Sequence, residues 1–249
     1  MIGKATLGDY MADATIELMN NTSSSVLLLI SSGVILFLAF KLLQRNTKSY
    51  LEWGMIVGFT VASLGCFQAA VSRVFYIFFE TGSLVETWEV ASYLYFSLML
   101  VALVAIFCVA LGIMLGKKAF NMGWVALFSL FAPFVGYWIL EGEVMVAPNV
   151  SDVQMTVVGL GLVFGPLSVM IVVNAILFLL IYRETNNQGA LNMALGMGVI
   201  VIAALLGAFT DLLGDIGRLF DSVSYLGVLV GMILMYKGFG QEVKSETSS

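Results

Sequence analysis

The run LMLVALVAIFCVALGIML, residues 98–115, decides the fold class. It carries no charge and, apart from Cys108, consists of apolar residues and one glycine. A helix needs about 20 predominantly apolar residues to cross a bilayer. Comparable runs recur along the whole chain. We predict seven membrane-spanning helices, at residues 25–43, 53–79, 91–116, 120–140, 154–182, 190–213 and 219–237.

The composition agrees with that interpretation. Of the 249 residues, 60% are hydrophobic and only 11% are charged, whereas soluble domains are nearer half apolar and a quarter charged. A globule of this size cannot bury such an excess, so much of it must face lipid. A soluble enzyme, a disordered protein, a secreted disulfide scaffold and a nucleic-acid binder are thereby excluded. We predict an all-α fold, a polytopic integral membrane protein with a seven-transmembrane-helix bundle.

Basic residues predict the orientation, because cytoplasmic loops are enriched in Lys and Arg. With the N-terminus outside and the C-terminus cytoplasmic, eight of the eleven basic residues fall inside. We therefore expect a multi-pass protein of the cell membrane. These eight residues are Lys41, Arg45, Lys48, Lys117, Lys118, Arg183, Lys237 and Lys244.

The chain divides into three predicted regions. Residues 25–239 form the membrane domain, and residues 240–249 form a short polar cytoplasmic tail. Residues 1–24 form an extracytoplasmic segment containing a short amphipathic helix on the outer face. That helix is indicated by apolar residues at helical spacing, namely Leu7, Tyr10, Met11, Ala14 and Leu18.

Two absences limit the chemistry. The chain has no histidine, which excludes imidazole-ligated metal centres and histidine acid–base catalysis. Cys66 and Cys108 lie in apolar runs and are too few for a zinc site. A bound retinal would need a lysine in the middle of the last predicted span, and no lysine lies there. We expect no metal, no cofactor and two buried cysteines.

A polar cluster at the outer ends of the spans is the candidate site. Arg73 lies near the outer end of the second predicted span, with Gln68 and Ser72 close to it on the same helix. A charge in a span is costly and is often functional. We expect its partners at the same depth, with Asp211 and Asp215 on the sixth helix and Arg218 and Asp221 at the start of the seventh.

This vestibule admits two interpretations, a ligand or ion site and a structural ion-pair network that closes the bundle. Snorkelling of Arg73 to the interface is a variant of the second. Hydroxyl groups from the third and fourth helices are further candidates, at Tyr93, Tyr95 and Tyr137.

Several weaker patterns concern packing. Residues 46–64 and 186–204 align at an offset of 140, which pairs Gly58 with Gly198 and suggests a repeated hairpin. Asn174 is alone in its half of the fifth span and is expected to form an interhelical hydrogen bond. Glycines four apart indicate close helix packing, within the chain or between copies, at Gly54/Gly58, Gly112/Gly116, Gly161/Gly165 and Gly227/Gly231.

Three function classes follow. The first is a receptor or sensor-like module with an outward-facing vestibule, acting through a membrane partner. The second is a small transporter or channel for an ion or small solute, and the third is an accessory subunit of a membrane complex. Polar residues are nearly absent from the inner half of the spans, which favours the first. An enzyme is disfavoured, because no nucleophile–base pair or metal-ligand set can be assembled. The expected partners are the bilayer, another membrane protein or a second copy, and an unidentified small ligand.

Overall fold

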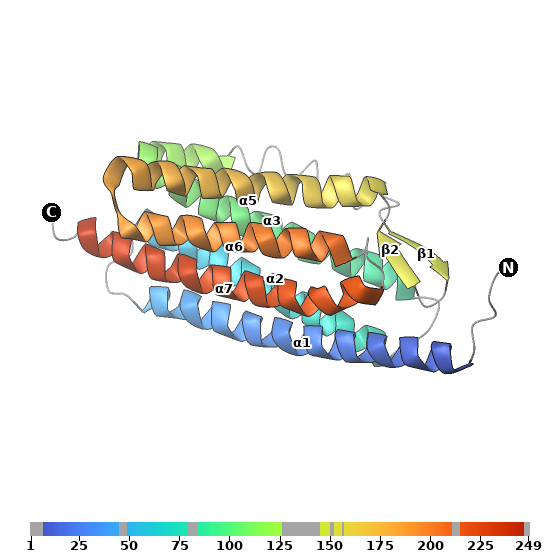
Figure 1. Ribbon diagram of the computed structural model, residues 1–249. Helices are drawn as coiled ribbons and strands as arrows, with labels where there is room; N and C mark the ends of the chain where they lie inside the picture. The colour runs from blue at the N-terminus through green and yellow to red at the C-terminus, as the bar shows by residue number, and fades with distance from the viewer. Residues whose placement is uncertain are drawn as a thin grey trace.

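The computed structural model describes residues 7–44, 49–78, 84–125, 145–149, 152–155, 157–210 and 215–246. Long helices that run side by side make up nearly all of them (Figure 1). The all-α prediction is confirmed. The helices are α1 (Leu7–Leu43), α2 (Tyr50–Phe78), α3 (Leu84–Leu115), a helical stretch over 117–125, α5 (Val157–Thr185), α6 (Gln188–Thr210) and α7 (Asp215–Glu246).

Five of the described helices contain a segment long and apolar enough to cross a membrane. α7 adds the shorter apolar segment Val223–Phe239. The fourth predicted span, 120–140, falls largely outside the described residues. The described part of the fold is a helical bundle with five candidate membrane spans, as a polytopic membrane protein would have. The five segments are Thr22–Leu43, Tyr50–Val74, Ser97–Leu115, Leu167–Thr185 and Gln188–Gly207.

The described helices form a closed ring in the order α1, α2, α3, α5, α6, α7 and back to α1. The centre of the ring is apolar, with the side chains of Phe59, Phe178 and Phe239 fully buried. The outside of the bundle exposes large apolar side chains, which a soluble protein would bury. Phe37 and Ile202, for example, are more than half exposed. Such surfaces fit a hydrocarbon surrounding rather than water.

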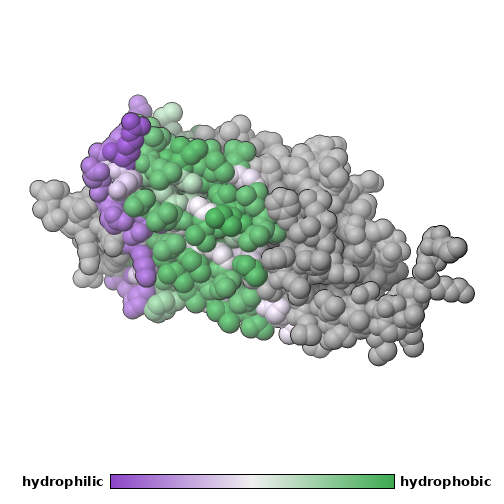
Figure 2. All heavy atoms as spheres, viewed as in Figure 1, coloured by the Kyte–Doolittle hydropathy of each residue, from purple (hydrophilic) through white to green (hydrophobic). Residues whose placement is uncertain are grey.

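One end of the bundle is polar. Hydrophilic residues form a narrow band there beside a broad hydrophobic surface (Figure 2). α1, α3, α5 and α7 all point their C-terminal ends this way, while α2 and α6 begin here. We call it the basic end, because five exposed cations lie on it: Lys41, Lys117, Lys118, Arg183 and Lys237.

Local sequence explains where the helices start and stop at this end. The backbone N–H of Glu52 donates to Ser49 Oγ at 3.2 Å, and the N–H of Ser49 donates to Glu52 Oε2 at 2.9 Å. This reciprocal pair is a capping box at the start of α2. Asn187 caps α6 by accepting a bond from the N–H of Gly189 at 2.7 Å. Gly116 ends α3 with φ of 82°, a conformation that favours glycine.

The closest helix pair is joined by small residues. A Cβ added at Gly196 of α6 would lie 2.6 Å from the carbonyl oxygen of Gly231 on α7. One added at Gly231 would lie 2.6 Å from the carbonyl oxygen of Gly196. This α6–α7 seam continues on either side through Gly238 against Gly189 and Gly227 against Ala203. The Gly227/Gly231 spacing therefore serves packing within the chain.

The other glycine pairs behave differently from one another. Gly54 and Gly58 of α2 pack on α3, where a Cβ at Gly54 would lie 2.6 Å from Val109 Cγ2. Gly116 has nothing within 4 Å of its added Cβ, so it serves the helix end instead. Gly198 is equally open, although the proposed repeat pairs it with the packed Gly58. The two positions thus have different surroundings.

The ends of the chain differ from the predicted division. α1 runs without a break from Leu7 to Leu43, so the predicted amphipathic helix is the first part of the first span helix. No proline interrupts this stretch, and its glycines are Gly8 and Gly33. At the other terminus, α7 extends to Glu246, well into the predicted polar tail.

A β-hairpin is the element that the sequence reasoning missed. Strand β1 (Met145–Asn149) pairs antiparallel with β2 (Asp152–Met155), with Met145 opposite Met155. The fifth predicted span began at residue 154, inside β2, whereas α5 begins at Val157. The alternation of polar and apolar residues over 152–155 is the signal that was available. The hairpin lies at the end opposite the basic end (Figure 1).

Candidate functional site

The candidate site is centred on a contact between Arg73 of α2 and Tyr225 of α7. Arg73 Nη2 donates a hydrogen bond to the Tyr225 hydroxyl at 2.6 Å. The guanidinium carbon lies 5.2 Å from the centre of the same ring, within cation–π range. Both side chains are half-buried. Two attractive interactions with one partner therefore hold the guanidinium in place.

The position of this contact explains why a charge is tolerated. Arg73 is the last residue but one of the apolar segment Tyr50–Val74 of α2. Tyr225 lies near the start of the apolar segment Val223–Phe239 of α7. Both residues thus occupy the edge of the apolar layer, at the end away from the basic end. The two helices are not neighbours in the ring, since α1 packs against both. The Arg73 side chain therefore reaches across the inside of the bundle.

Gln68 and Ser72 lie together on α2, as predicted from their spacing. Gln68 Nε2 donates to Ser72 Oγ at 2.9 Å, and Ser72 Oγ donates to the backbone carbonyl of Gln68 at 2.9 Å. Both side chains are half-buried. They add a polar surface close to Arg73 on the same helix, since Ser72 is the preceding residue.

The predicted acidic partners are placed differently. Asp215 is the first residue of α7, whereas the sequence reasoning placed it on the sixth helix beside Asp211. That placement is corrected, because α6 ends at Thr210. Asp211 lies outside the described residues. The pairing of Arg73 with Asp215 that the hairpin repeat suggested stays a prediction, because the side chain of Asp215 lies outside the described part of the structure.

Arg218 and Asp221 lie in the first two turns of α7, as expected. Positions 218, 221 and 225 follow at intervals of three and four, so they occupy one face of this helix. That face includes Tyr225, which contacts Arg73. The structure describes the backbone at positions 215, 218 and 221 and not their side chains. The structure thus places Arg73 in contact with α7, the helix that carries Arg218 and Asp221. The contact is made by Tyr225, which was not among the predicted site residues.

Tyr225 is the residue of the candidate site that the sequence did not reveal. Tyr93, Tyr95 and Tyr137 were considered as sources of hydroxyl groups, and of these only the side chain of Tyr95 is described, half-buried on α3. The available signal for Tyr225 was its place at the edge of an apolar stretch. Tyrosine is enriched there, because its ring can be buried while its hydroxyl finds a polar partner.

Between this contact and the basic end, the described interior is mainly apolar. Its largest fully buried side chains include Met55, Phe59, Met193 and Met235. Phe59 also meets Tyr236, with ring centroids 6.5 Å apart. These residues leave the centre of the bundle filled by hydrocarbon and sulfur rather than by charge.

Two of the buried polar groups in this layer join helices to one another. Asn174 is fully buried, and its Nδ2 donates to the Leu103 carbonyl of α3 at 3.0 Å. This confirms the predicted interhelical hydrogen bond. Ser63 Oγ of α2 donates to the Ser32 carbonyl of α1 at 2.9 Å. Glu52, buried at the basic end, belongs to the capping box. All of these groups have an evident packing or capping role.

The cysteines contribute no chemistry to this site. Cys66 and Cys108 are free thiols and are buried, as predicted. Cys108 packs beside Gly123, where an added Cβ would lie 2.9 Å from its sulfur. Across the part of the chain that the structure describes, no three metal-ligating side chains gather. The described chemistry is hydrogen bonding by a guanidinium, an amide and two hydroxyls, a donor set suited to carboxylate or phosphate oxygens.

Comparison with protein-family models, curated proteins and solved structures gives no match to this chain. The class of protein therefore rests on the fold itself, a polytopic bundle with a polar contact at one end.

Proposed function

We propose that the protein is a membrane receptor or sensor-like module, with its N-terminus outside and its C-terminus in the cytoplasm. Its polar site around Arg73 opens outward and binds a small ligand. The signal passes laterally to a membrane partner. The observation that supports this most is the Arg73–Tyr225 contact at one end of an otherwise apolar bundle.

The orientation is supported by the charge distribution. The exposed cations Lys41, Lys117, Lys118, Arg183 and Lys237 gather at one end. Cytoplasmic ends of spans carry such an excess, so the basic end faces the cytoplasm in this proposal. The end with Arg73, the β-hairpin and the start of α1 then faces outward.

The coupling of ligand to signal would use the ring of helices. Arg73 and Tyr225 connect α2 with α7, two helices that are separated by α1. A ligand that competes for the guanidinium would change the forces on both helices at once. The α6–α7 seam would carry a shift of α7 to its neighbour, because backbone atoms there are in direct contact.

A transporter or channel is the alternative, and the interior counts against it. Such proteins hold their substrates near the bilayer midplane between helices that can separate. Here the described midplane is filled by fully buried side chains such as Phe59 and Met197. Within the described residues, the one buried charged group is Glu52, which caps a helix.

Native mass spectrometry of the particle extracted from its own membranes in mild detergent tests this proposal. We expect a stoichiometric membrane-protein partner together with the full chain. A lone chain that moves a solute into reconstituted vesicles would instead establish the transporter and contradict the proposal. A partner that stays bound to the same extent with and without a ligand at Arg73 would indicate an accessory subunit.

A further inference from the structure

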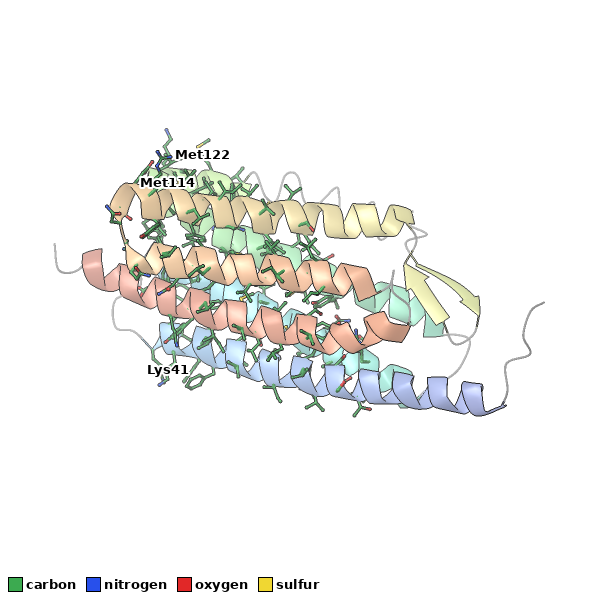
Figure 3. All side chains as sticks on the ribbon, viewed as in Figure 1. Lys41, Met114 and Met122 are labelled. Carbon is green, nitrogen blue, oxygen red and sulfur yellow. The ribbon has the colours of Figure 1, made fainter. Side chains whose placement is uncertain are left out.

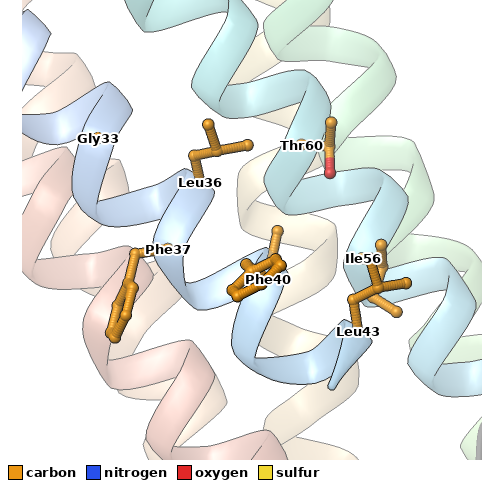
Figure 4. Close-up of a pocket in the computed structure, with 8 residues that line it drawn as sticks. Gly33, Leu36, Phe37, Phe40, Leu43, Ile56 and Thr60 are labelled. Carbon is orange, nitrogen blue, oxygen red and sulfur yellow. The ribbon is translucent and has the colours of Figure 1, made fainter. Parts of the chain in front are cut away.

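A groove opens between α1 and α2 on the outside of the bundle, in the half that adjoins the basic end. It has a volume of about 460 Å³ and is open to the medium that surrounds the bundle. Its walls are Leu36, Phe40 and Leu43 on α1 and Ile56 and Thr60 on α2 (Figure 4). The lining is apolar apart from the Thr60 hydroxyl.

Gly33 lines this groove and adds no side chain to it. A Cβ built at Gly33 has nothing within 4 Å. Leu36, Phe37 and Phe40 beside it are each about half exposed. In a bilayer, such a groove between two helices is filled by hydrocarbon, because an empty apolar space loses dispersion contacts.

A cation lies beside the groove, close to the basic end. Lys41 is exposed, and its Nζ lies 5.3 Å from the centre of the Phe37 ring, which also lines the groove. Lys41 stands at the C-terminal end of α1 and points away from the bundle (Figure 3). The groove therefore combines a long apolar wall with an ammonium group at the level of the lipid headgroups.

We propose that this groove binds one acyl chain of an anionic phospholipid, and that Lys41 holds the phosphate of that lipid. Anionic headgroups are attracted to basic residues beside a membrane span. The distribution of apolar surface and charge along α1 matches the order of parts in a phospholipid, hydrocarbon first and phosphate at the surface.

A second copy of the chain fits the groove less well. In a symmetric dimer, the same surface of each subunit faces the other. Two α1 helices packed in this way through Gly33 in parallel would bring the two Lys41 ammonium groups close together, and like charges repel. A flexible acyl chain carries no such penalty, and its phosphate neutralises the lysine.

Native mass spectrometry of the purified full chain, titrated with defined lipids, tests the proposal. The probes are phosphatidylglycerol and phosphatidylcholine with identical oleoyl chains. We expect one phosphatidylglycerol to bind more tightly than phosphatidylcholine. Lys41→Gln should weaken phosphatidylglycerol about fivefold, the effect of one basic residue near a charged surface. Lys117→Gln removes a cation elsewhere at the basic end and should leave that site unchanged.

The apolar half of the site has its own matched pair of variants. Gly33→Leu fills the groove and should weaken both lipids, since it removes space for the chain. Gly198→Leu is the control, because its added Cβ also has nothing within 4 Å, on α6. Leucine favours helices more than glycine does, so both variants should fold.

Three results would overturn the proposal. The first is equal affinity of the wild type for the two lipids. The second is a Gly33→Leu protein that binds lipid as the wild type does. The third is a wild-type dimer that Gly33→Leu separates, which would make the groove an interface between copies.

Discussion

Replacing Gly196 with alanine lowers the free energy of unfolding by about 1–3 kcal/mol, the usual cost of overpacking a tight contact. The new methyl group would lie 2.6 Å from the Gly231 carbonyl oxygen and 2.7 Å from Met235 Cγ. The obstacle includes backbone, which cannot rotate away as a side chain can. Relief requires α6 and α7 to separate along the whole seam. Thermal unfolding of the purified protein in detergent measures the effect.

Gly198→Ala is the matched control, two residues further along the same helix. Its methyl group has nothing within 4 Å. Alanine favours a helix over glycine by up to about 1 kcal/mol, so this variant should be unchanged or more stable. Equal loss of stability in the two variants would show that the α6–α7 seam is not the cause.

Replacing Arg73 with leucine strongly weakens ligand retention while leaving the fold intact. A hydrogen bond to a charged group contributes about 1.5–3 kcal/mol, so retention should fall by about tenfold to a hundredfold. Stability should change by less than about 1 kcal/mol. The lost bond to Tyr225 is offset because leucine at the edge of the apolar layer needs no polar partner. Native mass spectrometry measures retention, and thermal unfolding measures stability.

The structural interpretation of Arg73 makes the opposite prediction. If Arg73 formed a structural pair with Asp215, Arg73→Leu would leave a carboxylate without its cation and lose stability. The double variant Arg73→Leu/Asp215→Leu would then regain it. Tyr225→Phe completes the comparison, since it removes the hydroxyl that accepts the guanidinium bond. Strong coupling of Arg73 with Tyr225 in stability, above about 2 kcal/mol, would likewise favour a structural role.

The spans could be predicted from sequence because hydrocarbon imposes a single requirement on each of them. A run such as residues 98–115 is confirmed as part of α3, since every backbone group must be satisfied within the helix. The helix ends were harder to place. The sixth span was predicted to end at residue 213 and the seventh to begin at 219, whereas α6 ends at Thr210 and α7 begins at Asp215. Apolar residues continue through 212 and 213, so hydropathy alone could not locate these helix ends.

The candidate site was predicted in part for a similar reason. Spacing along one helix is readable from sequence, so the Gln68–Ser72 contact was found. Which helices face each other depends on the order of the ring, which hydropathy does not encode. The contact of Arg73 with Tyr225 of α7 was therefore not predicted. The packing of individual glycines could not be predicted for the same reason. Gly196 and Gly198 are both glycines of α6 two residues apart, yet Gly196 packs tightly against α7 and Gly198 has open space beside it.

Cysteine accessibility in intact cells tests most directly whether the site opens outward. In a protein with Cys66 and Cys108 replaced by alanine, Ser72→Cys places a thiol beside Gln68 at the site, and Gln44→Cys places one on the exposed end of α1. A small, charged, membrane-impermeant methanethiosulfonate should modify Ser72→Cys from outside and Gln44→Cys only after permeabilisation. Modification of Ser72→Cys only after permeabilisation, or of Gln44→Cys in intact cells, would contradict an outward-facing receptor site.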